Sequence, residues 1–215
     1  MRFRLMPLAP VGPLAPLCVQ RALADCPVAN QPFGTALQRR LLPGGDDGRG
    51  PVLATSDAWW PSLDAAAQLR EGGEGTAAVG PDGAPLAWIS TDGAQPISPA
   101  RIVPWQNASR LIRFPWDLLA VNEELVGALQ VDEIHGVVRP GVTIDGHVVV
   151  GPGTVLLPGV YLEGNVMIGR DCRIGPNCYL RGNTAIGDNC HIGQAVEIKN
   201  SILMNFPSCL YSCWK

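Results

Sequence analysis

The chain has 215 residues, of which 47% are hydrophobic and only 16% are charged, and its formal net charge at pH 7 is −3. The hydrophobic content is enough to build a folded core. The 25 glycines and 20 prolines stay below the share of roughly 25–30% that is typical of disordered chains. The sequence has no basic cluster of the kind that binds nucleic acid and no apolar run of the ~18 residues that a membrane-spanning helix needs. It therefore predicts no nucleic-acid partner and no membrane partner.

The N-terminal segment, Met1–Ala24, places Arg2 and Arg4 before apolar residues, a pattern that is superficially like a secretory signal peptide. Prolines interrupt the apolar stretch at Pro7, Pro10, Pro13 and Pro16. A signal peptide needs an uninterrupted apolar region, so the sequence predicts a cytoplasmic protein.

Residues 1–113 contain short apolar runs separated by proline and glycine, which predicts a small, reduced α/β domain. The expected helices are Thr35–Leu42 and Asp64–Leu69, and the expected strands are Pro51–Asp57, Thr76–Val79 and Leu86–Ile89. The last two strands flank a Gly-Pro-Asp-Gly turn and are expected to pair.

Residues 114–130 are predicted to be a capping helix and linker. Pro115 suits the first turn of a helix, and an apolar stripe follows it, formed by Leu118, Leu119, Val121, Leu125, Val126 and Leu129. A stack of repeats exposes a hydrophobic edge at its end. We therefore expect this helix to cover the N-terminal end of the repeat region that follows.

A repeat of six residues occupies the region 131–205. Every sixth residue is aliphatic: Val138, Ile144, Val150, Leu156, Leu162, Ile168, Ile174, Leu180, Ile186, Ile192 and Ile198. Four places after each of these stands a β-branched residue or a cysteine: Val142, Val148, Thr154, Val160, Val166, Cys172, Cys178, Thr184, Cys190, Val196 and Ile202. A period of six fits neither a helix nor a two-sided strand. It predicts a mainly β fold, a parallel β-helix of hexapeptides with both sets of residues pointing inward.

The seven cysteines include no CxxC pair and no spacing typical of a zinc site. Three of them, Cys172, Cys178 and Cys190, stand at inward positions of the repeat. They are therefore predicted to act as small hydrophobic core residues.

The repeat resembles that of the left-handed β-helix acyltransferases, whose coils are triangular prisms of three hexads. The resemblance implies a left-handed parallel β-helix of about three and a half coils, preceded by the helix and the reduced α/β domain. The six-residue rhythm stops after Asn205. Residues 206–215 are predicted to be an irregular tail, either an apolar plug for the last coil or a sequence read in a shifted frame.

With three hexads in each coil, equivalent residues of successive coils stack at one corner, roughly 5 Å from each other. Asp145, Glu163, Arg181 and Lys199 form such a column. Arg181 and Lys199 would be neighbours of like charge, which is unfavourable in a sheet. Glu163 can compensate Arg181 from below, and Lys199 has no acid above it. The pair is either a phosphate clamp or part of a solvated charge ladder.

One segment, Ile174–Asn200, resembles a particular family through Leu180-Arg181-Gly182 and Val196-Glu197-Ile198-Lys199. It is similar to the acetyltransferase domain of the bifunctional glucosamine-1-phosphate N-acetyltransferase/N-acetylglucosamine-1-phosphate uridylyltransferase family and its sugar-1-phosphate relatives. The resemblance implies that Arg181 and Lys199 bind the phosphate of an amino sugar. Gly182 stands where the family has proline.

The same resemblance implies acetyl-CoA as the co-substrate and a homotrimer as the assembly. The family's catalytic histidine lies in a His-Leu-x-Tyr-x-Gly-Asp segment beyond the lysine, and this sequence has no such segment after Lys199. We therefore expect a C-terminally truncated relative without the family's general base. His191 is expected to point outward because it precedes inward Ile192, and it is either a substitute base or an exposed histidine.

Residues 1–113 resemble the sugar-nucleotide transferases at Cys26–Phe33, which is similar to a Pro-Val-Ala-Asn-x-Pro stretch. In that family the strand corresponding to Pro51–Asp57 ends in an acid that helps to hold Mg²⁺, which implies this role for Asp57. The alternative for Asp57 is an acid that ends a strand or caps a helix. The family's phosphate-binding Gly-x-Gly-Thr-Arg loop is missing, although nucleotidyl transfer needs such a loop.

Together these features predict a protein of sugar-phosphate or sugar-nucleotide metabolism, a relative of enzymes that transfer an acetyl group from acetyl-CoA to an amino-sugar 1-phosphate. Whether this chain is itself an active transferase stays open. Two alternatives are a non-catalytic sugar-phosphate-binding or regulatory subunit and a sugar-1-phosphate nucleotidyltransferase.

Overall fold

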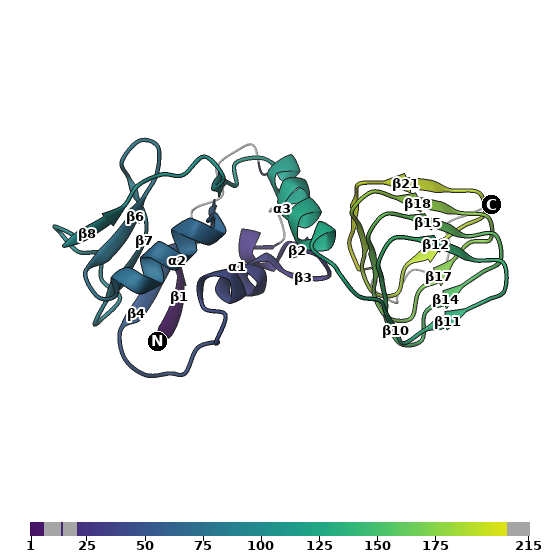
Figure 1. Cartoon of the computed structure of the whole chain (residues 1–215), viewed down its shortest axis with the longest axis horizontal. Helices are drawn as coiled ribbons and strands as arrows, with labels where there is room; N and C mark the ends of the chain where they lie inside the picture. The colour runs from purple at the N-terminus through teal and green to yellow at the C-terminus, as the bar shows by residue number, and fades with distance from the viewer. Residues whose placement is uncertain (7–13, 15–20, 206–215) are drawn as a thin grey trace. The chain divides into compact units, whose positions relative to one another are not determined.

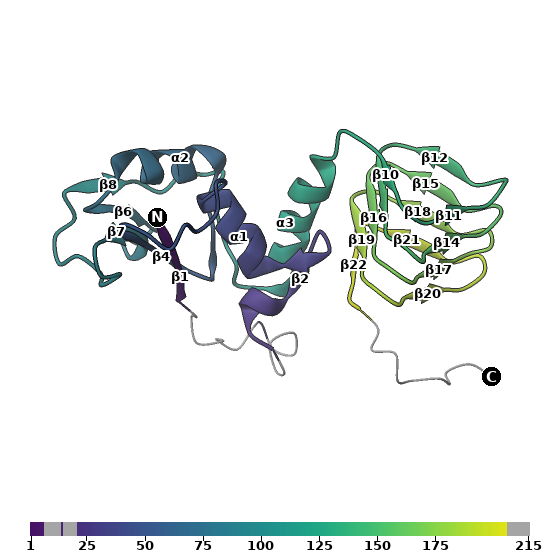
Figure 2. The same cartoon turned by 90° about the horizontal axis from the view of Figure 1, so that it is seen from below.

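The structure is a computed structural model that describes residues 1–6, 14 and 21–205. The tail predicted at 206–215 lies outside the described residues. The chain divides into two compact units, shown in Figures 1 and 2. The first unit contains the described residues of Met1–Cys26 together with Pro32–Asp117, and the second contains Pro27–Gln31 and the described residues from Leu118 onward.

A mixed five-stranded sheet forms the centre of the first unit, with strand order β1-β4-β7-β6-β8. Its strands are β1 (Arg2–Met6), β4 (Val52–Ser56), β7 (Pro85–Ser90), β6 (Thr76–Val79) and β8 (Arg101–Val103). All of β4 is buried, because β4 lies between parallel β1 and antiparallel β7. The predicted pairing of the two later strands is confirmed, since β6 and β7 run antiparallel.

Two helices accompany this sheet, and α2 lies over one of its faces in Figure 2. They are α1 (Phe33–Leu41) and α2 (Leu63–Gly72), and a short antiparallel pair is formed by β5 (Trp59–Trp60) and β9 (Arg110–Leu111). Phe33, Leu37 and Leu41 are fully buried, an apolar stripe with the spacing of a helix that has one face against a core. Helix α2 begins after Ser62, whose hydroxyl accepts a hydrogen bond from the Ala65 backbone N–H at 3.0 Å, as an N-cap does. Both predicted helices are therefore present.

The second unit is a parallel β-solenoid of three sheets, as the hexads predict. Figure 1 shows its coils obliquely, as a stack of loops. The first sheet contains β10 (Glu133–Ile134), β13 (Val148–Val150), β16 (Val166–Ile168), β19 (Thr184–Ile186) and β22 (Ile202–Leu203). The second contains β11 (Val137–Val138), β14 (Val155–Leu156), β17 (Arg173–Ile174) and β20 (His191–Ile192). The third contains β12 (Thr143–Asp145), β15 (Tyr161–Glu163), β18 (Tyr179–Arg181) and β21 (Glu197–Lys199).

The inward residues of the hexads form the core of the solenoid. Aliphatic residues from Val150 to Ile192 are buried in one cluster with the valines and cysteines of the second set from Val148 to Cys190, and Thr154 and Thr184 of that set are buried too. Each strand pairs with its equivalent in the next coil, so before the last strand the inward side chains stack on their counterparts there. The predicted burial of Cys172, Cys178 and Cys190 is confirmed.

The helix that precedes the solenoid, α3 (Pro115–Gly127), packs beside the coils rather than over their end. Its residues Leu125 and Val126 contact Met167 and Ala185, which point outward from the first sheet. The side-chain amide of Asn165 also donates to the backbone carbonyls at the end of the helix, those of Val126, Gly127 and Leu129. Ile134 and Val138, in the first coil, remain 42% and 37% exposed. The expected cap over the N-terminal end is therefore wrong, because the outward face of the first sheet is itself apolar and receives the helix.

A tight hairpin formed by β2 (Pro27–Val28) and β3 (Gln31–Pro32) carries the Pro-Val-Ala-Asn sequence. Ala29 and Asn30, at its turn, have φ values of 44° and 56°, the left-handed backbone region that a two-residue hairpin loop requires. The Ala29 N–H donates to the Asn122 side chain at 2.9 Å, and the Asn122 amide donates to the Asn183 carbonyl at 2.8 Å. Fully buried Asn122 thus connects the hairpin to the solenoid through α3.

The six-residue rhythm changes at the last described strand. Ile202 is predicted to point inward, but it pairs with outward Ala185, while Leu203 pairs with inward Ile186 and joins the core. The corner after Lys199 is one residue shorter than the equivalent corner after Arg181, because Lys199 pairs with Arg181 and Ile202 pairs with Ala185. The predicted inward position of Ile202 is therefore wrong.

Cys172 belongs to a hydrogen-bonded ladder inside the solenoid. Its backbone N–H donates to the Thr154 hydroxyl at 3.0 Å, and its sulfur accepts the backbone N–H of Cys190 at 3.4 Å. Hydrogen bonds from Cys190 lower the pKa of the Cys172 thiol from its ordinary 9.0 to about 7, and the bond from the Cys190 side chain has the largest effect. Burial of the thiol raises the pKa but does not outweigh these bonds.

This lowered pKa makes the stability of the fold depend on pH. Between pH 7 and 9 the unfolded chain keeps the Cys172 proton that the folded chain has released, so the contribution of Cys172 to the free energy of unfolding rises with pH across this window and is lost below about pH 7. We expect Cys172→Val to flatten this rise, measured by urea unfolding at a series of pH values. Cys178→Val is the matched control, because Val160 and Val196 occupy the equivalent positions of the neighbouring coils, and a flattened rise in the control alone would contradict the assignment.

Candidate functional site

The outer face of the third sheet carries two columns of functional side chains. In each strand the middle residue, such as Leu162 or Leu180, points into the core, so the two flanking residues point outward. The register pairs Asp145 with Glu163, Glu163 with Arg181, and Arg181 with Lys199. We call these four residues the charged column. The predicted column is confirmed, in the predicted order.

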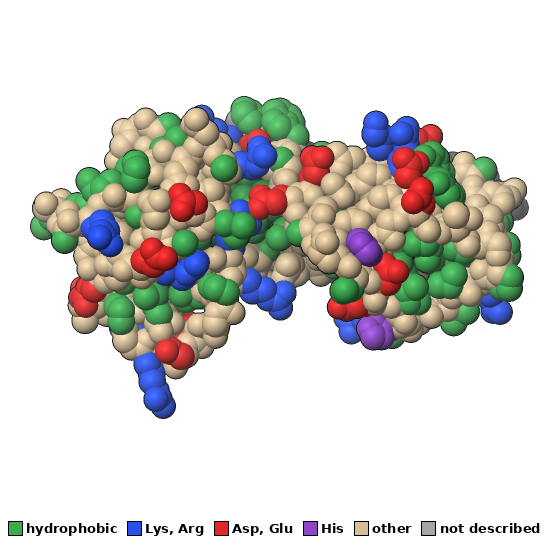
Figure 3. Space-filling view, viewed as in Figure 1, with side chains coloured by type: hydrophobic (Ala, Val, Ile, Leu, Met, Phe, Trp, Pro, Cys, Tyr) green, Lys and Arg blue, Asp and Glu red, His purple; other side chains and the backbone are tan. Residues whose placement is uncertain are grey.

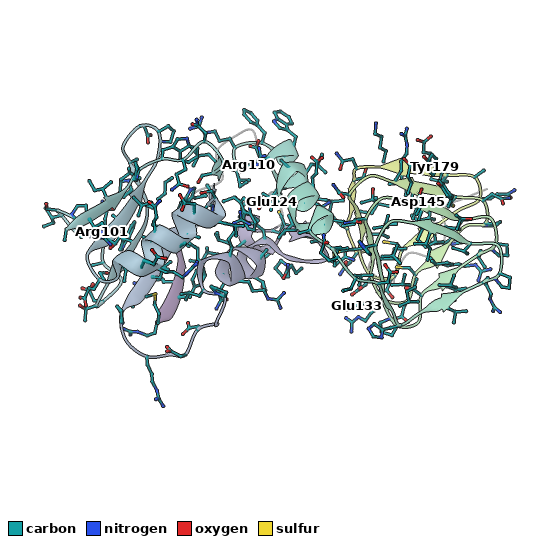
Figure 4. The ribbon with its side chains drawn as sticks, viewed as in Figure 1. Arg101, Arg110, Glu124, Glu133, Asp145 and Tyr179 are labelled. Atoms are coloured by element: carbon teal, nitrogen blue, oxygen red, sulfur yellow. The ribbon has the colours of Figure 1, made fainter. Side chains whose placement is uncertain are left out.

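A second column runs parallel to the first and consists of Thr143, Tyr161, Tyr179 and Glu197. Sequence reasoning missed it, although the spacing that defines the charged column also reveals this one. The two tyrosine rings lie 5.4 Å apart between centroids at an interplanar angle of 36°. Charged side chains gather on this face of the solenoid in Figure 3, and Figure 4 labels Asp145 and Tyr179 there.

The two columns are connected by diagonal contacts that repeat from coil to coil. The Tyr161 hydroxyl donates to Asp145 at 3.2 Å, and the Tyr179 hydroxyl donates to Glu163. One coil further on, the Arg181 Nε–H donates to Glu197 at 2.7 Å. The hydrogen bond to Asp145 raises the pKa of Tyr161 above its ordinary value of 10.0, so this phenol stays a hydrogen-bond donor at neutral pH.

The surroundings of Arg181 differ from the sequence expectation. Its counter-ion is Glu197, in the other column, and no ion pair joins it to Glu163 directly below. The Arg181 side chain is 36% exposed, so its guanidinium still faces solvent. Lys199 is exposed, and its ammonium group has no hydrogen-bond or ion-pair partner within the part of the chain that the structure describes.

The remaining predicted site residues lie elsewhere. His191 is exposed on the second sheet, paired in register with Arg173, whereas Arg181 and Lys199 are on the third. Within one chain the structure therefore does not bring His191 into the charged column. Asp57 follows β4 and is buried, 1% exposed. No group of three or more His, Cys, Asp or Glu residues that could hold a metal ion occurs among the described residues.

This arrangement is suited to anion binding. The cationic groups of Arg181 and Lys199 project from adjacent strands, whose backbones are roughly 4.8 Å apart in any sheet, and the hydrogen-bonded coils hold this spacing. A guanidinium presents a planar fork of donors and an ammonium presents a compact charge, and together they suit a phosphate better than a single cation does.

Comparison with known families finds a match in the second unit. Residues 165–200 match the family model described as bacterial transferase hexapeptide (six repeats), a stretch that contains both Arg181 and Lys199. The fold and the repeat together make the second unit a parallel β-solenoid of hexapeptides, which over these residues is similar to the hexapeptide-repeat transferases. No curated protein matches the chain. None of the helices among the described residues is long and apolar enough to cross a membrane.

Proposed function

We propose that this chain binds an amino-sugar 1-phosphate on the outer face of the third sheet and takes part in transferring an acetyl group from acetyl-CoA to the sugar's amine. The observation that carries the proposal is the stacking of Lys199 on Arg181, with no counter-ion for Lys199 among the described residues. Two cations at paired positions of adjacent strands repel each other, and a phosphate between them would attract both and offset this repulsion.

The family resemblance supports the same two residues. The arginine of a Leu-Arg corner and the lysine of a Val-Glu-x-Lys segment hold the sugar phosphate in the glucosamine-1-phosphate acetyltransferases, and Arg181 and Lys199 stand at these positions. The register of β18 and β21 agrees with such a pair. Glu197, on the same strand as Lys199, already holds Arg181, so the guanidinium is oriented before a ligand binds.

Isothermal titration calorimetry with glucosamine-1-phosphate in low salt tests the proposal. We expect the wild-type chain to bind and Lys199→Ala to weaken binding by roughly 1–3 kcal/mol, the size of a charge-assisted contact. Arg173→Ala is the matched control, because it removes an exposed cation from the second sheet and should leave the affinity within error.

Two results would contradict this assignment. Absence of heat with a folded wild-type sample removes the sugar-phosphate site. An equal loss of affinity in Arg173→Ala and Lys199→Ala would mean that the ligand responds to overall charge rather than to this face.

The alternative of a non-catalytic binding subunit is favoured by one observation. A general base must lie within hydrogen-bond reach of the amine, directly or through one water, and His191 is on a different sheet from Arg181 and Lys199. Release of CoA thiol from acetyl-CoA in the presence of glucosamine-1-phosphate decides between the two, since a binding subunit releases none. Sedimentation analysis of the same sample tests the proposed homotrimer, in which a neighbouring copy would have to complete the site.

The nucleotidyltransferase alternative depends on Asp57 and Mg²⁺ in the first unit. Mg²⁺ in such sites is held by one or two carboxylates together with substrate phosphates and waters. Asp57 is almost fully buried, 1% exposed, which keeps its carboxylate from the waters and substrate phosphates that would complete such a site. The residues present do not fit a Mg²⁺ centre, and we derive no step through one.

A further inference from the structure

Glu163 and Arg181 are register partners on adjacent strands, and opposite charges in this position attract each other. They nevertheless form no ion pair in the structure. Instead, the Glu163 carboxylate accepts the hydroxyl hydrogen of Tyr179, and Arg181 donates to Glu197. The acid closest to Arg181 along the charged column is therefore held by a neutral side chain.

Tyr179 is the residue that separates the two charges. It lies on the same strand as Arg181, two positions before it, and its ring centroid is 5.5 Å from the guanidinium carbon. Its hydroxyl points down the solenoid to Glu163 in the previous coil. One side chain thus contacts Arg181 with its ring and restrains Glu163 with its hydroxyl.

This restraint matters for anion binding. A carboxylate that pairs with the guanidinium must be displaced before a phosphate can use the same donors, and the displacement lowers the apparent affinity. With Glu163 bound to Tyr179, Glu197 is the only acid that Arg181 pairs with in the described part of the chain, and it uses the Nε–H. The two terminal nitrogens of the guanidinium then remain for a ligand.

We propose that Tyr179 is a positioning residue of the anion site: its hydroxyl keeps Glu163 from pairing with Arg181 and so leaves the guanidinium available to a phosphate. This inference rests on the proposed function for its effect on ligand affinity. Its structural part, the position of the Glu163 carboxylate, is independent of any ligand.

The chain contains a matched control one coil earlier. Tyr161 donates to Asp145 in the same diagonal geometry, and the residue above Asp145 in the column is Glu163 rather than a cation. Removing the Tyr161 hydroxyl therefore frees the Asp145 carboxylate, which has no guanidinium next to it on the adjacent strand.

Calorimetry with glucosamine-1-phosphate on four variants, each checked by circular dichroism for an unchanged fold, tests the proposal. We expect Tyr179→Phe to weaken binding by roughly two- to five-fold, the size of a competing ion pair that is partly exposed to solvent. Tyr161→Phe should leave binding unchanged. In a Glu163→Gln background, the Tyr179→Phe exchange should change the affinity by less than roughly 1.5-fold, because the freed side chain no longer carries a charge.

A crystal structure of Tyr179→Phe supplies the second readout, with a Glu163–Arg181 ion pair within hydrogen-bond distance as the expected result. If the wild-type chain binds no sugar phosphate, the proposed function fails, and this structure still decides the role of Tyr179. A Glu163 carboxylate that stays away from Arg181 in the variant overturns the inference. A loss of affinity that persists in the Glu163→Gln background overturns it as well, since the effect would then belong to the phenol itself.

Discussion

Replacing Leu162 by alanine is expected to lower the free energy of unfolding of the solenoid by about 2–5 kcal/mol. Leu162 is fully buried in β15, in the second of the stacked coils, and the alanine variant leaves a cavity that its stacked neighbours Ile144 and Leu180 cannot fill without moving. Urea unfolding followed by far-UV circular dichroism measures the change.

An outward residue of the same sheet is the control for this variant. Thr143 is exposed in β12, and Thr143→Ala should change the free energy of unfolding by no more than about 0.5 kcal/mol. Buried Trp59, Trp60 and Trp88 lie in the first unit, so their fluorescence follows that unit during the same titration. A Leu162→Ala variant as stable as wild type would mean that the stacked aliphatic residues do not carry the stability of the coils.

Replacing Asn122 by alanine is expected to cost about 2–4 kcal/mol, because two backbone groups lose their partner and a buried group without a partner costs about 1–3 kcal/mol. These groups are the Ala29 N–H, which is buried, and the Asn183 carbonyl, which is partly buried. Hydrogen exchange measured by mass spectrometry should show faster exchange in the hairpin at 27–31 as well as a lower overall stability.

The neighbouring residue Glu123 is the control for Asn122. It is exposed on α3, and Glu123→Ala keeps a residue with good helix propensity. We expect the hairpin of the Glu123→Ala variant to exchange its amide hydrogens at the same rates as in wild type. If Asn122→Ala also matches wild type there, the hairpin is held by its apolar contacts instead of by the amide of Asn122.

The solenoid was predictable because its hydrophobic pattern has a period that no other regular structure satisfies. The position of α3 was not. Its apolar stripe suits either the end or the side of a β-helix, and the choice depends on the outward residues of the first sheet. Val149, Met167 and Ala185 stand at equivalent positions of successive coils and are register partners. They therefore form an apolar column that the sequence analysis did not use.

In the candidate site, the sequence predicted which residues stack on each other but not which acid pairs with Arg181. Spacing along the chain placed Lys199 above Arg181, because a solenoid converts a fixed spacing into a vertical neighbour. It also suggested Glu163 as the partner of Arg181. The observed partner is Glu197, because side chains from the two columns contact each other diagonally between adjacent strands. Glu163 instead accepts a hydrogen bond from the Tyr179 hydroxyl.

By itself the sequence determined the repeat, its inward residues as far as the last corner and the order of charges along the third sheet, since each of these follows from periodicity. Only the tertiary structure decided which face α3 covers, where the last corner loses a residue and which acid accompanies Arg181. These features depend on contacts between side chains that lie far apart in the sequence, where several pairings satisfy the same pattern and the geometry of packing selects one.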